Sequence, residues 1–392
     1  MTTFDLPADY FKVALGLSSR EREALAALRA YLERDVRPIV NDHWAREEFP
    51  FGIVKPLAEL GVFGPMFPEV RRFENSALYR GWAMLELARI DGSLATFAGV
   101  QTGLSMGSIY HCGSDEQIAN YLPRMAQGEI IGCFGLTEPL SGSDAARGIT
   151  ATAERVGDTW TLNGEKRWIG NGTWADICVF WAKDVADDQV KGFVVPTDST
   201  GFSATKITNK LSLRIVQNAN LTLRNVRLPE SQRLQRASSF KDTSRVLRHT
   251  RTENGWIAAG MQIGAYEAAL AYTQARVQFG RPIASYQLVQ DLLVKSLSNI
   301  TATLTMMKQL ADMTDRGERI DEMAALAKAF TTSRARETVA WCRELVGGNG
   351  IDLHYDVARF FADTEAVHTY EGTREINTLI VGRDITGIAA FI

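Results

Sequence analysis

Near the C-terminus of this 392-residue chain, a glutamate stands between an aromatic residue and a glycine, in the order Tyr370-Glu371-Gly372. An aromatic neighbour and a flexible backbone position suit a carboxylate held in an apolar site, where desolvation raises its pKa. A raised pKa lets a carboxylate accept a proton from carbon near neutral pH. Glu371 is therefore the candidate general base. Because most glutamates are solvated surface charges, the rest of the chain must support this interpretation.

Two stretches in the middle of the chain suit a planar heterocyclic ligand. FGLTEPLSGSD carries hydroxyls at Thr137 and Ser143 that can bind the polar edge of a ring or a phosphate. KRWIGNG places Trp168 beside a glycine-rich turn, where the indole can stack on a ring. Each stretch alone is ambiguous, because polar surface loops and core tryptophans are commoner than ligand sites.

Further along, three features suit a large anionic ligand. ARVQFGRP places Arg276 on the last turn of an expected helix, within reach of a pyrophosphate, with Phe279 available to cover an apolar ring. Gly347-Gly348 follow another expected helix and are either a helix C-cap or part of the same site. Arg251 is a candidate for a phosphate or adenine contact, or else for a surface ion pair.

Composition excludes several other classes of function. The net charge of −3 gives no reason to expect a nucleic-acid partner, and no apolar run reaches the length of a membrane span. The 4 cysteines and 5 histidines show no metal-ligand spacing, so we expect no metal site. The N-terminal residues include acidic side chains where a targeting peptide would be basic, so we expect a mature, cytoplasmic protein.

The candidate residues must be positioned by three regions of different periodicity. Helical spacing follows a capping-box pattern at Ser18 and Glu21, and it includes an almost uncharged stretch, 95–110, which is either a buried core helix or the wall of an acyl pocket. Short alternating runs then predict strands, with a hairpin at Asn163-Gly164. Long amphipathic segments follow.

This order predicts an α+β protein without a Rossmann sheet. We expect an N-terminal helical domain over 1–130, a middle β-barrel or sandwich domain over 131–235, and a C-terminal four-helix bundle over 236–392 that carries Glu371.

Five motifs together resemble the acyl-CoA dehydrogenase family over essentially the whole chain. They are FGLTEPLSGSD, KRWIGNG, ARVQFGRP, LVGGNGI and TYEGT, in the family's order. NKLSLRIVQN and GRDITGIAAF look closest to glutaryl-CoA dehydrogenases and plant short-chain acyl-CoA oxidases. The resemblance implies FAD between the β domain and the C-terminal bundle, and a homotetramer.

The resemblance also implies residue roles. Glu371 would remove the α-proton of an acyl-CoA thioester while a β-hydride passes to the flavin, giving trans-2-enoyl-CoA and sending electrons to electron-transfer flavoprotein. The implied cofactor-binding residues are Leu136, Thr137, Ser143, Trp168, Ile169, Gly170, Arg276, Phe279, Gly347, Gly348 and Thr373. Arg276, Phe279, Gly347 and Gly348 would serve the FAD of a neighbouring subunit. The implied substrate contacts are Ser143, Arg251, Tyr370 and Gly372.

Departures from the family pattern leave alternatives open. Gly170 replaces the threonine of most dehydrogenases, which removes a hydroxyl, opens space beside the flavin and favours an acyl-CoA oxidase that makes H2O2 from O2. Ala95 stands where the glutaryl branch has an arginine, so glutaryl-CoA is disfavoured because its buried carboxylate would lack a partner. Glu253 is the other carboxylate considered as base, but the relocated base of branched-chain members aligns with Thr250.

Two further points concern the whole site. The loop containing Arg71-Arg72-Phe73 departs from the family's glycine-rich pattern, so we expect a reshaped entrance. A non-catalytic flavoprotein with the same fold is a third possibility, against which the presence of Glu371 and Trp168 argues.

Overall fold

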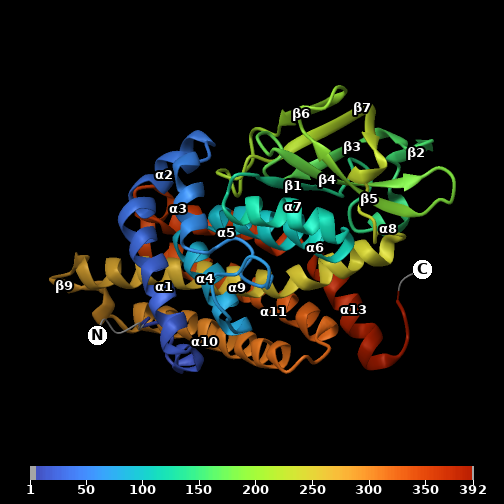
Figure 1. Ribbon diagram of the computed structural model, residues 1–392. Helices are drawn as coiled ribbons and strands as arrows, with labels where there is room; N and C mark the ends of the chain where they lie inside the picture. Colours follow the sequence, from blue (N-terminus) through green and yellow to red (C-terminus); the bar gives the residue numbers. More distant parts are fainter. Residues whose placement is uncertain (1–5, 391–392) are drawn as a thin grey trace.

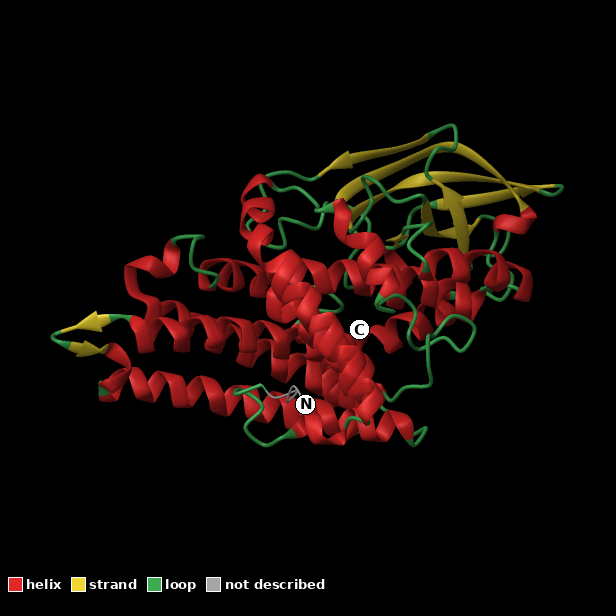
Figure 2. Ribbon diagram, turned by 60° about the vertical axis from the view of Figure 1, so that its left-hand side comes forward, coloured by secondary structure: helices red, strands yellow, loops and turns green. Residues whose placement is uncertain are grey.

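The computed structural model describes residues 6–390 and places a β-sheet on one side of a large assembly of helices (Figures 1 and 2). The N-terminal helices are α1 (Ser19–Tyr31), α2 (Arg37–Arg46), α3 (Val54–Glu59), α4 (Ala77–Ile90), α5 (Gly92–Gly99), α6 (Gly107–Cys112) and α7 (Asp115–Ala126). The predicted capping box is confirmed. Ser18 Oγ accepts a hydrogen bond from Glu21 N at 3.3 Å, and the Glu21 carboxylate accepts one from Ser18 N at 2.7 Å.

The nearly uncharged stretch lies at the centre of the molecule. It forms α5, the π-helical segment η4 (Val100–Met106) and α6, and it is buried over most of its length. Because η4 packs against both the sheet and a long C-terminal helix, this wall separates the β region from the helical bundle. Nearly every residue of 95–109 is buried, as expected of a core helix.

The middle region forms one curled sheet. Its strands are β1 (Gly132–Gly135), β2 (Thr152–Val156), β3 (Thr159–Ile169), β4 (Ile177–Asp184), β5 (Val190–Pro196), β6 (Phe202–Lys206) and β7 (Ala219–Pro229). The order is β1-β4-β2-β3-β7-β6, with β5 paired to β4. The β1–β4 and β2–β4 pairings are parallel, and the other pairings of this sheet are antiparallel.

The predicted hairpin at Asn163-Gly164 is wrong. β3 continues through these residues, and its register with β7 shifts between Leu162 and Gly164, as at a β-bulge. The chain reverses instead at Gly157, between β2 and β3. A Cβ on Gly164 would lie 2.7 Å from the Ala151 Cα, so this glycine permits a close approach within the sheet.

The C-terminal region is helical, as predicted. It contains α9 (Phe240–Ala275), α10 (Gln287–Asp315), α11 (Asp321–Val346), α12 (Val357–Thr369) and α13 (Arg374–Thr386). Helices α9, α10, α11 and α12 pack together, and α13 packs on α11. A small hairpin, β8 (Val277–Gln278) and β9 (Arg281–Pro282), projects from the end of α9, at the left of Figure 1. None of the helices formed by residues 6–390 is long and apolar enough to cross a membrane.

A buried cluster of charged groups joins the three regions. Arg359 of α12 donates from Nη1 to Asp91 Oδ2 at 2.7 Å, at the boundary between α4 and α5. Asp363, one turn further along α12, accepts hydrogen bonds from Trp44 Nε1 at 2.9 Å and from Leu213 N at 2.6 Å. These contacts fix α12, and with it the loop that carries Glu371, against the N-terminal helices and the loop before β7.

Candidate active site

Glu371 lies in the short loop between α12 and α13, and its backbone has an uncommon conformation. Its φ is 56°, and Gly372 follows with a φ of 83°. A left-handed conformation at a glutamate costs on the order of 1 kcal/mol or more and persists only where the surroundings fix it. The glycine accepts such a φ without strain, so the pair makes a sharp turn that points the Glu371 side chain back toward α9.

This turn is fixed by two side chains that sequence reasoning missed. Lys328 of α11 donates from Nζ to the carbonyl oxygens of His368 at 2.8 Å and Gly372 at 2.7 Å. Asn377 of α13 donates from Nδ2 to the Gly372 carbonyl at 2.9 Å. Burial lowers the pKa of Lys328 to about 8, although the charges of Glu371 and Glu375 oppose this. Lys328 is therefore a buried cation that holds the Glu371 loop in place through two backbone carbonyl groups.

The Glu371 carboxylate has a mixed environment. Burial raises its pKa, while a hydrogen bond from Thr250 and the charges of Lys328 and Arg251 act in the opposite direction. The Thr250 hydroxyl donates to Glu371 Oε2 at 2.8 Å. Glu371 is only partly covered by protein, so it reaches an accessible space with a basicity above that of an ordinary glutamate. These are the properties required of a general base.

The opposite wall of this space comes from α5, η4 and α9. The Tyr370 hydroxyl lies 3.3 Å from Thr96 Oγ1 of α5. Glu253 of α9 has its carboxyl group against two glycines: a Cβ on Gly103 would lie 2.8 Å from Glu253 Oε2, and one on Gly99 would lie 3.4 Å from it. Burial, followed by the charge of Glu371, raises the pKa of Glu253 to about 8. We call the space between these groups the crevice.

The two middle motifs lie side by side. Arg167 N donates to the Thr137 carbonyl at 2.8 Å, which joins FGLTEP to KRWIGNG. Trp168 has a φ of 65° and remains 51% exposed, with the Arg167 guanidinium 5.0 Å from its ring centre. Leu136 and Ile169 are buried. An indole this exposed near the end of strand β3 offers a flat surface for another ring.

A buried ion pair fixes these motifs from below, and it too was missed. Lys166 donates from Nζ to Glu138 Oε1 at 2.8 Å and to the Leu136 carbonyl at 3.1 Å. Glu138 also accepts hydrogen bonds from Thr150 N at 2.8 Å and Ala151 N at 3.0 Å. Both charged side chains are almost fully buried. Such a pair is weak evidence for stability, but its many bonds hold the segment after β1 against strand β3.

Gly170 and the remaining nearby residues complete this part of the site. The open space expected at Gly170 is partly filled, since an added Cβ would lie 3.2 Å from Val100 Cγ2 and 3.5 Å from Val216 Cγ1. Ser143 is exposed in the loop before the short helix α8 (Ala145–Gly148). Thr373 caps α13, where its hydroxyl accepts a hydrogen bond from Ile376 N at 3.3 Å.

The other predicted cofactor residues lie at the opposite end of the bundle. Arg276 directly follows α9, and Phe279, at the tip of the β8–β9 hairpin, is 94% exposed. Gly347 and Gly348 begin η7 (Gly347–Ile351), at the end of α11. Lys328 and the end of α11 are roughly 27 Å apart, at 1.5 Å per helical residue. Within one chain, these residues therefore lie too far from Glu371 and Trp168 to belong to the same site.

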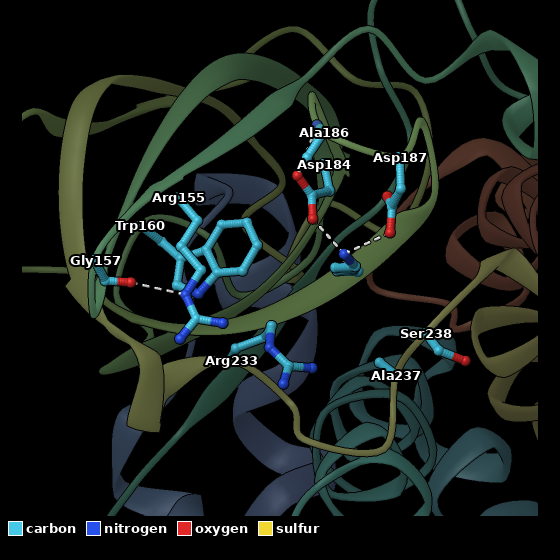
Figure 3. A pocket seen from close by; sticks show the side chains of 10 residues that line it. Arg155, Gly157, Trp160, Asp184, Ala186, Asp187, Arg233, Ala237 and Ser238 are labelled. Carbon is cyan, nitrogen blue, oxygen red and sulfur yellow. Dashed lines mark hydrogen bonds and ion pairs between the residues drawn. The ribbon is translucent and has the colours of Figure 1, made fainter.

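A separate hollow lies beside the sheet (Figure 3). It measures about 550 Å³ and is lined by residues of the sheet and of the segment before α9. Lys191 pairs with both Asp184 and Asp187, and Arg233 pairs with Glu230 at 2.7 Å. None of the predicted site residues lines it, so this hollow has no part in the site described above.

Comparisons with known proteins agree on one family. The N-terminal, middle and C-terminal domains of acyl-CoA dehydrogenases match residues 18–129, 133–226 and 240–386. A probable acyl-CoA dehydrogenase, YngJ of Bacillus subtilis, is 29% identical over 376 residues, covering 94% of this chain and 98% of that protein.

Solved structures extend this agreement. A glutaryl-CoA dehydrogenase from Mycobacterium smegmatis, in complex with FADH2, is 36% identical, covers 98% of both chains and has a TM-score of 0.92. Butyryl-CoA dehydrogenase from Megasphaera elsdenii is 27% identical, covers 94% of this chain and 98% of its own, and has a TM-score of 0.89. Because matches to all three parts follow in order along nearly the whole length, this chain belongs to the acyl-CoA dehydrogenase family.

Proposed function

We propose that this protein uses FAD to convert an acyl-CoA thioester to the trans-2-enoyl-CoA, with Glu371 as the general base. The observation that carries the proposal is the setting of Glu371: a carboxylate with a raised pKa, held in a braced left-handed turn and facing the crevice. The α C–H of a thioester is weakly acidic, so a base of raised pKa with a fixed direction of approach is the group that the reaction needs.

FAD is the cofactor of this family, and the exposed face of Trp168 fits its ring. When bound, FAD accepts the hydride that leaves the β-carbon. The residues of this chain that would contact it near the crevice are Leu136, Thr137, Ser143, Trp168, Ile169, Gly170 and Thr373. A second set, Arg276, Phe279, Gly347 and Gly348, would contact the FAD of a neighbouring subunit in a homotetramer.

The second set is exposed and includes an aromatic ring, an open backbone segment and a guanidinium, which suit contact with the FAD of a neighbouring subunit. Phe279 is 94% exposed, which is costly for a phenyl ring in water unless another molecule covers it. A Cβ on Gly347 or Gly348 would meet nothing within 4 Å, so the backbone there is open to a close approach. Arg276 is exposed beside them and supplies a guanidinium for a pyrophosphate.

The acyl-CoA contacts would come from Ser143, Arg251, Tyr370 and Gly372. Burial lowers the pKa of Arg251, whereas the charges of Glu371 and Asp321 raise it, so this guanidinium lies among acidic groups at the α11 side of Glu371. With a CoA thioester bound, the Arg251 guanidinium would offset part of the negative charge that the thioester brings into the site.

A dicarboxylate substrate fits poorly. Ala95 is fully buried in α5 and offers no charge to a distal carboxylate. Glu253 supplies no positive charge on the same side of the crevice and lies within reach of the charge of Glu371, so a second carboxylate there would meet repulsion from Glu371 instead of a cationic partner. We therefore propose a substrate other than glutaryl-CoA, with electron-transfer flavoprotein as the electron acceptor.

Anaerobic bleaching of the flavin by acyl-CoA thioesters of graded length, glutaryl-CoA included, tests the proposal. We expect bleaching by a subset of monocarboxylic thioesters and little by glutaryl-CoA. Absence of bleaching by any thioester would contradict the proposed function. Admitting air afterwards separates the acceptors, because slow reoxidation with turnover only on adding electron-transfer flavoprotein excludes the oxidase, whereas rapid reoxidation with H2O2 supports it.

A further inference from the structure

Glu253 stands in the crevice without a place in the reaction proposed above. It lies three residues after Thr250 on α9, so the two side chains project from neighbouring turns of the same helix face. Thr250 contacts the Glu371 carboxylate directly, and the charge of Glu371 acts on Glu253. Glu253 therefore faces the same space as the general base.

The wall opposite Glu253 leaves room for its carboxyl group. Gly99 and Gly103 lie four residues apart, on one face of the continuous α5–η4 helix. A methyl group on Gly103 would lie only 2.8 Å from Glu253 Oε2 and 3.0 Å from Oε1. Any larger residue at 103 would displace the Glu253 carboxyl group, so the carboxyl group occupies space that only a glycine at 103 leaves free.

Among the side chains that the structure describes, Glu253 has no hydrogen bond or ion pair. The charged groups that act on the nearby Glu371, namely Lys328 and Arg251, are not among those that influence Glu253. Burial and then the charge of Glu371 hold the pKa of Glu253 at about 8. A carboxyl group without a protein partner in a covered site is costly, and such groups concentrate where a ligand completes their bonds.

We propose that Glu253 selects acyl thioesters whose acyl chain carries a hydrogen-bond donor, an ammonium or a hydroxyl group, beyond the β-carbon. This inference rests on the proposed function, because it takes the crevice to be the acyl site. A plain alkyl chain would leave the carboxyl group unpaired, and a distal carboxylate would bring a second negative charge close to that of Glu371. A donor is the substituent that satisfies Glu253 in either protonation state.

The test compares butanoyl-, pentanoyl- and hexanoyl-CoA with their ω-hydroxy and ω-amino derivatives. Anaerobic flavin bleaching gives the dissociation constant and the rate for each thioester. In the unchanged enzyme we expect a donor-bearing thioester to be preferred over its plain counterpart by about tenfold or more. Glu253→Leu should reverse this preference, because it replaces the acid with an alkyl surface of similar size.

Glu253→Gln distinguishes the two donors. The amide oxygen still accepts from a hydroxyl but provides no charge, so preference for the ω-hydroxy thioester should survive and preference for the ω-amino thioester should fall by about tenfold. Glu267→Gln is the control: it lies on the same helix, and its carboxylate pairs with Arg89 at 2.8 Å, away from the crevice. FAD content and the thermal midpoint of each variant report whether it is folded.

The outcomes separate this inference from the proposed function. If plain thioesters bleach the flavin and are preferred, and Glu253→Leu and Glu253→Gln leave the ratios unchanged, the inference is overturned while the proposed function stands. If no thioester bleaches the flavin of the folded, FAD-loaded enzyme, the proposed function fails and the inference fails with it.

Discussion

Two pairs of carboxyl groups lie inside this protein, and their surroundings differ. Asp91 and Asp363 accept hydrogen bonds from a guanidinium, an indole and backbone N–H groups. Among the described residues, the carboxyl groups of Glu253 and Glu371 accept one hydrogen bond between them, from the Thr250 hydroxyl to Glu371, and they face the crevice. Burial raises the pKa of a member of each pair, to about 7 for Asp363 and to about 8 for Glu253.

The difference lies in what completes the bonds of each pair. The Asp91–Asp363 pair is completed mainly by protein, with Asp363 Oδ2 left without a hydrogen bond among the described residues, and its contacts join α12 to the N-terminal helices. The Glu253–Glu371 pair is left incomplete and accessible, so its groups can form bonds with a bound molecule. A raised pKa alone therefore does not identify a functional carboxylate, and neither does one unpaired oxygen, since Asp363 has both; Glu253 and Glu371 differ in that they are also partly exposed.

The largest effect is expected from Glu371→Gln. The amide keeps the size of the side chain but cannot accept the α-proton, so anaerobic bleaching by acyl-CoA should slow by on the order of a thousandfold or more. FAD content should remain unchanged, because the residue faces the substrate side. Glu375→Gln is the matched control, since Glu375 is an exposed carboxylate in the same segment. Bleaching at the original rate by the Glu371 variant would remove it as the base.

Arg359→Met tests the pair completed by protein. The change leaves Asp91 and Asp363 buried without their cation, so we expect a loss of about 3–5 kcal/mol in the free energy of unfolding. Arg46→Met is the control. Its ion pair with Glu48 is 3.0 Å long and exposed, so its removal should cost at most about 1 kcal/mol. Urea unfolding of the FAD-loaded proteins measures the free energy of unfolding of each variant. Equal losses would show that the buried cluster contributes no more to stability than an exposed ion pair.

Glu253→Gln tests the other pair through the pH dependence of stability. The pKa of Glu253 is about 8 in the folded protein, against 4.5 for an ordinary glutamate, so the folded state holds a proton that the unfolded state has released. Stability is therefore lost as pH rises between these values, at up to about 1.4 kcal/mol per pH unit. The amide has no such proton. Relative to wild type, the variant should gain stability from about pH 5 to about pH 9, up to a few kcal/mol.

Thermal midpoints measured across this range check the prediction. A difference between variant and wild type that is constant with pH would mean that Glu253 is ionised throughout, as an ordinary surface glutamate is. The same experiment on Asp363→Asn is the internal comparison. Its pKa of about 7 places the corresponding change at lower pH, and loss of its bonds to Trp44 and Leu213 adds a destabilisation at every pH.

What the sequence predicts well depends on local interactions. The capping box at Ser18 and most strand and helix positions follow from spacing alone, because neighbouring residues decide them. The Asn163-Gly164 hairpin was predicted from equally local information and is wrong, because pairing of β3 with β7 holds the strand straight through a bulge. The Asn-Gly sequence is compatible with both a turn and a bulge, and pairing with the distant strand β7 selects the bulge.

The candidate site shows the same division. Glu371 and Trp168 are predicted from their motifs, but the groups that hold Glu371 in place come from distant parts of the chain, Thr250 on α9 and Lys328 on α11. The AALAKAF context of Lys328, a lysine in an apolar helical run, was the available signal. Glu253 was considered only as an alternative base, since its position against Gly103 depends on how α9 packs on η4.

The smallest effect is expected from Lys328→Met. This variant tests how far a buried cation holds the Glu371 turn and sets the pKa of Glu371. The variant removes two hydrogen bonds from the Glu371 turn and a charge that lowers the pKa of Glu371. Bleaching should slow by about tenfold, and its pH profile should move to higher pH, because the base then ionises less readily. Lys295→Met, which removes an exposed pair with Asp291 on α10, should change neither.

The two readouts separate two roles for Lys328. A slower rate with an unchanged pH profile would mean that the lysine only places the turn, while a shifted profile shows that its charge also sets the basicity of Glu371. Unchanged rate and profile would mean that Asn377 and the packing of α13 suffice to hold the left-handed turn. In that case the crevice pair would be more like Asp91 and Asp363 than we argue, fixed by the surrounding fold and independent of one buried cation.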